Sequence, residues 1–142
     1  MNFDSVAQSY ISQAEERFAL AKLELERKKY NITVRLCQEV VELALKACLR
    51  IVNVEPPKFH DVGPVLKDNL DKFPSWFKER IEVFASYSRS LRKERELSMY
   101  GDEETNTPPE ILYSEYDAQQ SLKMAEEILD YSKKLFEEKK RR

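Results

Sequence analysis

The residues best suited to chemistry lie around Arg95, near the end of a long stretch of helical periodicity. All but one of the preceding residues at spacings of three and four are apolar, so the Arg95 cation is directed toward the interior of a helical domain. A guanidinium matches the oxygens of phosphate in pairs, which predicts that Arg95 binds phosphate, with Arg92 as a secondary cation. Alternatively, the helix end emerges from the domain here and Arg95 only snorkels to solvent. The residues of this stripe are Phe77, Ile81, Phe84, Ser88, Leu91, Arg95 and Ser98.

Tyr100, Asp102 and Glu42 are the candidate partners of this arginine. Tyr100 and Asp102 follow it closely in the sequence and offer a hydroxyl and a carboxylate that can contact ligand hydroxyl groups. Glu42 lies on a different predicted helix, and it would orient Arg95 if the two helices are neighbours, which the sequence by itself does not establish. If the protein is an enzyme, Arg95 and Tyr100 are its candidate catalytic residues.

Residue types argue against several other kinds of site. Gly63 and Gly101 lie too far apart in the sequence to form a Gly-rich phosphate loop. His60 is the single histidine, and it is interpreted as a capping or packing residue rather than a proton-transfer group, because no serine lies in a nucleophile motif. Cys37 and Cys48 fall on one predicted helix, roughly 16 Å apart, which is too far for a disulfide and indicates buried thiols. We therefore expect no metal ion and no cofactor.

The composition predicts one domain over residues 1–142. With 42% hydrophobic and 11% aromatic residues, the chain can fill one core. Its 24 Lys and Arg nearly balance 26 Asp and Glu, for a formal charge of −2, so any contact with nucleic acid must come from a local patch. No apolar run approaches the roughly 20 residues of a membrane span, and the N-terminus lacks the layout of a signal peptide. We expect a cytoplasmic protein without membrane contact.

The periodicity and the breakers predict an all-α fold. All prolines and glycines lie between residues 56 and 109, which leaves two tracts free for long helices. The first tract is too long for one helix in a domain of this size, so we expect a turn near residues 28–31, with Asn31 as a helix cap. The predicted helices cover residues 4–28, 32–53, a short segment after the His60 turn, 75–100 and a last helix that begins near residue 114.

The helix over residues 32–53 is predicted to be the central one, because it is apolar over most of its circumference. Its polar strip is interpreted as a solvated face, in which Arg35 pairs with Glu39 and Glu42 pairs with Lys46 at helical spacing. Pro56 and Pro57 are expected to stop this helix.

The connection between the last two long helices is also informative. Gly101 suits a left-handed C-terminal cap, and Ser114 begins the last helix with a sequence that resembles a capping box. The connection from Gly101 to Tyr113 is long for a compact helical domain, and such loops are commonly either functional or poorly ordered.

Two parts of the sequence resemble the HEPN domain family. Residues 37–47 (Cys-Gln-Glu-Val-Val-Glu-Leu-Ala-Leu-Lys-Ala) and 57–62 (Pro-Lys-Phe-His-Asp-Val) resemble its second helix and the His-Asp turn that follows. Residues 95–102 (Arg-Glu-Leu-Ser-Met-Tyr-Gly-Asp), then Pro108-Pro109 and Tyr113-Ser114, resemble an Arg-x4-Tyr-Gly-Asp variant found in small stand-alone prokaryotic, especially archaeal, members. These segments occur in the order and at the spacing typical of the family, and the resemblance covers nearly the whole chain.

The resemblance implies an up-and-down bundle of four long helices plus one short helix, often as a symmetric homodimer. It also implies pairing with a minimal nucleotidyltransferase, in several cases as a toxin-antitoxin system. Active HEPN ribonucleases carry Arg-x4-6-His and cleave RNA without metal at a site shared by two protomers. This sequence matches the arginine with Arg95 but has Tyr100 where the histidine is expected.

The substitution bears directly on catalysis. RNA cleavage without metal needs a group that accepts the 2′-hydroxyl proton and a cation that stabilises the phosphorane. Imidazole performs the first task at neutral pH, whereas a phenol performs it poorly. The predicted site is therefore better suited to binding phosphate than to cutting it.

Three hypotheses follow from these sequence features. The first is a protein that binds nucleotide or RNA phosphate and acts as partner of a nucleotidyltransferase in a toxin-antitoxin-like system. The second is a weak metal-independent ribonuclease toxin that uses the same residues. The third is a non-catalytic helical interaction module, in which Arg95 and Tyr100 serve packing or dimerisation.

Overall fold

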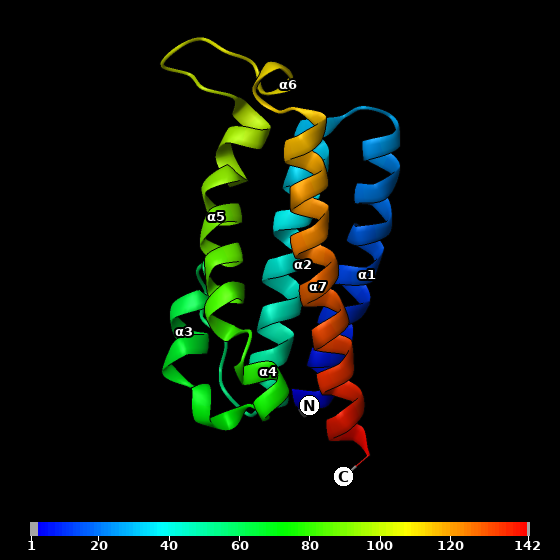
Figure 1. The fold of residues 1–142 in the computed structure, drawn as a ribbon, viewed down its shortest axis with the longest axis vertical. Helices are drawn as coiled ribbons and strands as arrows, with labels where there is room; N and C mark the ends of the chain where they lie inside the picture. Colours follow the sequence, from blue (N-terminus) through cyan, green and yellow to red (C-terminus); the bar gives the residue numbers. More distant parts are fainter. Residues whose placement is uncertain (1–2, 142) are drawn as a thin grey trace.

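The computed structural model describes residues 3–141 and has the architecture of an up-and-down helical bundle. Successive long helices run in opposite directions, and the two ends of the described chain lie at the same end of the bundle (Figure 1). The long helices are α1 (Phe3–Glu26), α2 (Tyr30–Ile51), α5 (Ile81–Tyr100) and α7 (Glu115–Lys140). The short ones are α3 (Gly63–Asp68), the 3-10 helix η1 (Leu70–Lys72), α4 (Ser75–Lys78) and α6 (Pro109–Leu112). The expected all-α class and the four long helices are confirmed.

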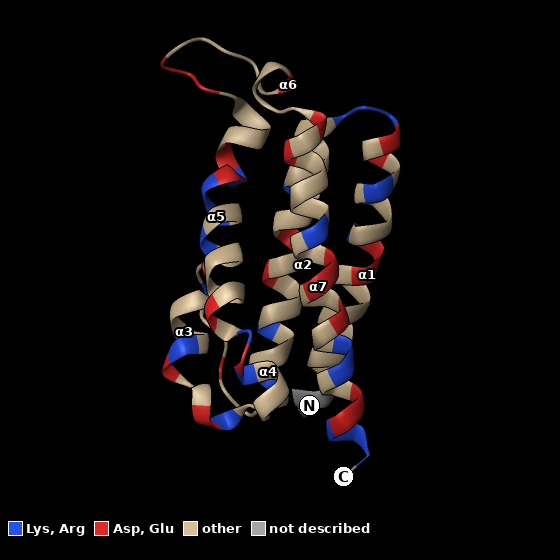
Figure 2. Ribbon diagram, in the orientation of Figure 1, with Lys and Arg blue, Asp and Glu red and all other residues tan. Residues whose placement is uncertain are grey.

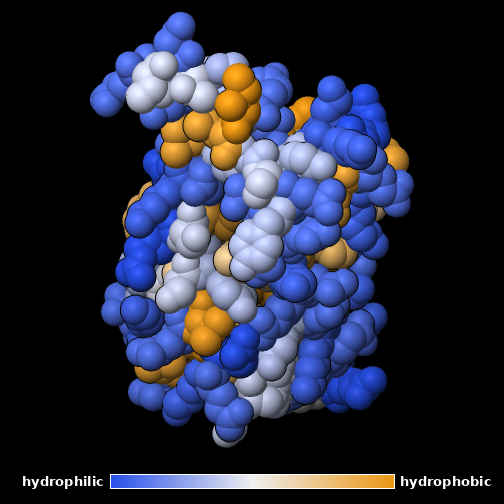
Figure 3. All heavy atoms as spheres, turned by 45° about the horizontal axis from the view of Figure 1, so that its top comes forward, coloured by the Kyte–Doolittle hydropathy of each residue, from blue (hydrophilic) through white to orange (hydrophobic). Residues whose placement is uncertain are grey.

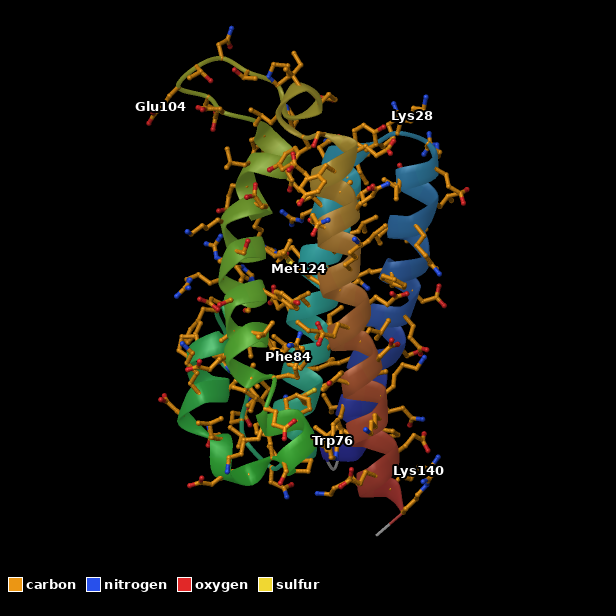
Figure 4. All side chains as sticks on the ribbon, in the orientation of Figure 1. Lys28, Trp76, Phe84, Glu104, Met124 and Lys140 are labelled. Atoms are coloured by element: carbon orange, nitrogen blue, oxygen red, sulfur yellow. The ribbon has the colours of Figure 1, made fainter. Side chains whose placement is uncertain are left out.

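The second long helix is central, as its apolar pattern predicts. It packs against α1, α5 and α7, and most of its residues are buried. Figure 4 shows Phe84 and Met124 between α5 and α7, on the inner side of the bundle. In the part of the chain that the structure describes, no helix is long and apolar enough to cross a membrane.

The ends of α1 and α2 are set by residues in the left-handed region rather than by the expected caps. Lys28 has a φ of 62°, and the N–H of Lys29 donates to the carbonyl of Glu24, five residues back, which closes α1. Asn53 has a φ of 63° and closes α2 in the same way, ahead of the two prolines that were expected to stop it. Asn31 is not a cap, because α2 begins at Tyr30 and the Asn31 side chain donates to the carbonyl of Ser98 on α5.

The segment predicted as one helix from residue 75 to residue 100 is broken into α4 and α5. The break falls at Glu79 and Arg80, and Arg80 is then free to reach across to α7, where it makes a two-point ion pair with Glu127 at 2.7 and 2.8 Å. A group of packed aromatic rings holds α4 against the lower ends of α5 and α7. The rings are Phe73, Trp76, Phe77, Phe84 and Tyr131.

The connection between α5 and α7 is an ordered turn. Asp102 and Thr107 exchange both backbone hydrogen bonds at 2.9 Å, and Glu104 lies at the exposed tip (Figure 4). Gly101 has a φ of 75° with a ψ of −168°, so glycine is required, although this conformation lies outside the left-handed helical region expected of a cap. Ser114 and Asp117 form the predicted capping box. Figure 2 shows that the tip of this turn is acidic, whereas the α1–α2 connection is basic.

Candidate phosphate-binding site

The seam between α2 and α5 holds a connected group of polar side chains, which we call the Glu42 cluster. Glu42 is its centre and accepts hydrogen bonds from Gln38 Nε2 at 2.9 Å and Lys46 Nζ at 3.0 Å. His60 Nδ1 lies 3.0 Å from both carboxylate oxygens of Glu42. The members of the Glu42 cluster are Gln38, Glu42, Lys46, His60 and Arg95.

Arg95 reaches into this seam from α5, as its place on the apolar stripe predicts. Its Nη1 donates to Gln38 Oε1 at 2.8 Å and lies 3.7 Å from Glu42 Oε1. The contact with Glu42 that the sequence could not establish is therefore present. The side chain is 23% exposed, and its Nε and Nη2 groups have no partner among residues 3–141. One edge of the guanidinium is thus anchored while the other can still donate to a ligand.

His60 is positioned by the residues that follow it. Asp61 Oδ1 accepts from the backbone N–H of Gly63 and from the hydroxyl of Ser88 on α5, at 3.0 and 2.9 Å. The same hydroxyl accepts from the N–H of Val62 at 3.0 Å. Because Ser88 is buried and ties this turn to α5, the preceding imidazole is held against Glu42 on α2. The polar Ser88 in the apolar stripe is explained by this connection.

The carboxylate of Glu42 stays ionised at neutral pH. Burial raises its pKa. The hydrogen bonds from His60, Gln38 and Lys46 and the positive charge of Lys46 together lower the pKa by more than burial raises it, so the net pKa lies below the ordinary value. An ionised Glu42 holds the imidazole and the ammonium group in place through charge-assisted hydrogen bonds.

Cations outnumber carboxylates along this seam. Beside the Glu42 cluster, Glu39 pairs with Arg17 of α1 at 2.8 Å and with Arg35 at 3.1 Å, and Arg35 also donates to the backbone carbonyl of Arg95. Asp61 and Glu96 reduce the excess without removing it; Glu96 pairs with Arg92, and the charge of Arg95 also helps to lower its pKa. A chain with a formal charge of −2 therefore has a locally positive seam. The groups counted are Arg17, Arg35, Lys46, Arg92 and Arg95 against Glu39, Glu42, Asp61 and Glu96.

The other predicted site residues lie outside the cluster. Arg92 is engaged by Glu96 one turn further along α5, at 2.9 and 3.2 Å. Tyr100 is 64% exposed, and its hydroxyl has no partner in the described part of the chain. Five residues of helix turn it about 140° around α5 from Arg95. Asp102 Oδ1 accepts from the N–H groups of Glu104 and Thr105, so this carboxylate shapes the turn.

The polar strip of α2 is not the solvated face that was expected. The predicted pairs Arg35–Glu39 and Glu42–Lys46 are confirmed, but all four side chains are half-buried between neighbouring helices. The sequence reasoning also missed Gln38, which is 2% exposed and is the direct partner of Arg95. Its spacing of four residues from Glu42 was the available signal.

Both cysteines are buried and unpaired, as predicted. Burial raises the pKa of Cys37 to about 12 and raises that of Cys48 as well. Within the described residues, no group of three or more His, Cys, Asp or Glu side chains is arranged to hold a metal ion.

Exposed apolar side chains gather where α5 ends and α6 lies, at the opposite end of the bundle from α3 and α4. Figure 3 shows this apolar surface beside the projecting turn, with polar residues around it. A hollow of about 380 Å³ adjoins it between α5, α6 and α7. The exposed residues here are Leu97, Met99, Tyr100, Ile111, Leu112 and Tyr116.

Comparison with known proteins agrees with this architecture. The fold is similar to the crystal structure of ST0689, an archaeal HEPN homologue, with a TM-score of 0.70 and 23% sequence identity over 92% of this chain and 97% of that one. The family model for the HEPN domain matches residues 7–135. The chain belongs to the HEPN domain family. A search of curated proteins found no match.

Proposed function

We propose that this protein binds the phosphate groups of a nucleotide or of RNA at the Glu42 cluster, with Arg95 as the principal ligand. The observation that carries the proposal is the state of the Arg95 guanidinium. One of its nitrogens is fixed by Gln38 and Glu42, and the other two face a solvent-accessible seam without a partner among the described residues. A guanidinium held in this way is preorganised for two-point contact with phosphate oxygens.

The charge around Arg95 supports an anionic ligand. Lys46, Arg95 and the imidazole of His60 all contact the carboxylate of Glu42. A structural arginine would be expected to satisfy its donors internally, as Arg80 does with Glu127 on α7. The contrast between these two arginines favours the ligand role for Arg95 over a packing role.

The test compares Arg95→Met with Arg27→Met. Arg27 is more than half exposed at the end of α1, so its replacement removes the same charge away from the seam. Binding is measured by fluorescence anisotropy with a labelled oligoribonucleotide. Competition by ATP and by inorganic phosphate then distinguishes RNA from free nucleotide as the source of the phosphate. We expect Arg95→Met to raise the Kd about 10- to 100-fold and Arg27→Met to change it less than threefold. Equal binding by both variants would refute the proposal.

The proposal that this protein acts with a partner protein rests on its membership of the HEPN family. HEPN domains often dimerise, and the exposed apolar surface beside α6 offers area for a contact between two copies or with a nucleotidyltransferase. In this proposal the protein is the toxin-like half of a cytoplasmic two-component system, and Tyr100 and Asp102 lie beside the contact. Co-purification from the native host with mass spectrometry tests it. Recovery of the chain with no nucleotidyltransferase would count against this part only.

A further inference from the structure

We infer that the hollow between α5, α6 and α7 binds an aliphatic polyamine, a flexible chain of methylene groups that carries two or more ammonium groups. The hollow has a volume of about 380 Å³, which is within the range of sites for small molecules. None of its lining residues belongs to the Glu42 cluster, so the inference does not depend on the proposed phosphate site.

The charged groups that line the hollow are carboxylates. Glu94 Oε1 accepts from the hydroxyl of Tyr113 at 2.7 Å, and Asp117 Oδ2 accepts from a backbone N–H of the capping box at 3.0 Å. The second oxygen of each carboxylate has no partner among residues 3–141. No Lys, Arg or His side chain lines the hollow in the described part of the chain, and the exposed Lys93 and Lys123 lie outside it. The lining therefore suits a positively charged ligand.

Two tyrosines strengthen the attraction for a cation. The ring of Tyr116 lines the hollow and the residue is 67% exposed, so an ammonium group can approach its face. Burial of Tyr113, its hydrogen bond to Glu94 and the charges of Glu94 and Asp117 all raise the pKa of Tyr113. Both carboxylates therefore act on one part of the hollow, where a positive charge is stabilised.

Ser121 is a buried polar side chain that lines the hollow and lacks a partner. It is 7% exposed, and its hydroxyl forms no hydrogen bond with any residue from 3 to 141. The hydroxyl groups of the other buried serines in this range are all hydrogen-bonded, namely those of Ser88, Ser98 and Ser132. Because buried polar groups are almost always paired, the Ser121 oxygen indicates a ligand that donates a hydrogen bond inside the hollow. An ammonium group is such a donor.

Apolar side chains form much of the remaining lining and suit the methylene groups of the ligand. Figure 4 shows one of them, Met124, between α5 and α7. Because Glu94 belongs to α5 and Asp117 to α7, ammonium groups separated by methylene groups can contact both carboxylates. An inorganic cation would leave the apolar lining uncovered. The apolar lining residues are Val34, Leu91, Leu112 and Met124.

Isothermal titration calorimetry of the full chain with spermidine tests the inference, with MgCl2 as the control ligand. We expect saturable binding of one spermidine and no comparable binding of Mg²⁺. Glu94→Gln should raise the spermidine Kd about 10- to 100-fold, since a hydrogen bond to a charged group is lost. Glu104→Gln removes the same charge at the exposed tip of the turn and should change the Kd less than twofold.

Ser121→Ala keeps the test valid if Glu94→Gln disturbs folding through Tyr113. It removes only a hydroxyl that has no partner in residues 3–141, and it should raise the Kd about three- to tenfold. NMR of the methionine methyl groups supplies a second readout. The Met124 signal should shift in a saturable manner with spermidine, whereas the signal of Met99, which is exposed on α5 outside the hollow, should stay in place.

Three results would overturn the inference. The first is no saturable binding of spermidine at millimolar concentration. The second is equal weakening by Glu94→Gln and Glu104→Gln, which would show a general attraction to an acidic surface. The third is a Met124 signal that does not move at saturation. Loss of a dimer in Glu94→Gln, with no spermidine binding by the wild-type protein, would also overturn it and would assign the hollow to a contact between two copies of this chain.

Discussion

Glu42→Gln is expected to destabilise the protein at neutral pH and to matter little in acid. Glutamine has the same shape but no charge, and its NH2 group, which donates, replaces one of the two oxygens that accept from Gln38, Lys46 and His60. Hydrogen bonds from charged groups contribute about 1.5 to 3 kcal/mol each, and breaking a fully buried ion pair costs about 3 to 5 kcal/mol. The Glu42 side chain is 16% exposed and keeps some access to water, so we expect a loss of about 2 to 3 kcal/mol. In a chain of this size, that corresponds to a fall of roughly 6 to 12 °C in Tm.

The pH dependence has a definite sign. The pKa of Glu42 in the folded protein is below the ordinary value of 4.5, so the carboxylate contributes stability above that pH and loses it as the pH falls through the folded pKa. The wild-type protein should therefore approach the stability of Glu42→Gln as the pH falls below about 4.5 and through the lower folded pKa.

Urea denaturation followed by circular dichroism at pH 7.5, 5 and 3.5 measures this difference. Glu104→Gln is the matched control, because Glu104 lies at the exposed tip of the turn and its removal changes the net charge equally. The control should match the wild type within about 0.5 kcal/mol at each pH. A Glu42→Gln variant that unfolds like the wild type at pH 7.5, or a stability gap that stays constant in acid, would refute the assigned role of Glu42.

Three further outcomes are expected. Gly101→Ala should lower the Tm by several degrees and increase proteolysis of residues 102–108, because its Cβ would clash with the carbonyl oxygen of Thr107 and the φ is positive; an unchanged Tm would contradict the observed turn. Cys37 and Cys48 should react with a thiol reagent only after unfolding, since both are buried and their pKa values are raised; fast labelling of the native protein would contradict this. Light scattering at micromolar concentration should give about twice the 16.8 kDa chain mass, and a strictly monomeric species would count against the homodimer.

The long helices were predictable because their signals are local and repetitive. Twenty or more residues of apolar spacing define α2, and the capping box at Ser114 is written in four consecutive residues. The breaks were less predictable. Lys28 is a residue type that local propensity does not place in the left-handed region, and the interruption at Glu79 and Arg80 accompanies the contact of Arg80 with Glu127 of α7.

Only the part of the candidate site that lies on α5 was predictable from the sequence. The register of the α5 stripe placed Arg95 toward the interior, and this is where it lies. Its partners could not be ranked, because Gln38 and His60 approach from segments 57 and 35 residues away in the sequence and their meeting depends on how α2 packs against α5. The sequence alone favoured Tyr100 as the companion of Arg95, since it is near in sequence, whereas the helix turns it to another face.

The most direct test of the central claim is to observe the Arg95 side chain itself while a ligand is added. In a ¹⁵N NMR titration with a short oligoribonucleotide, the Nε–Hε signal of Arg95, assigned by its loss in Arg95→Met, should shift in a saturable manner, and its exchange with water should slow. The signal of Arg27 should stay in place. An Arg95 signal that does not move at saturation, while other arginine signals do, would contradict the phosphate site in the seam between α2 and α5.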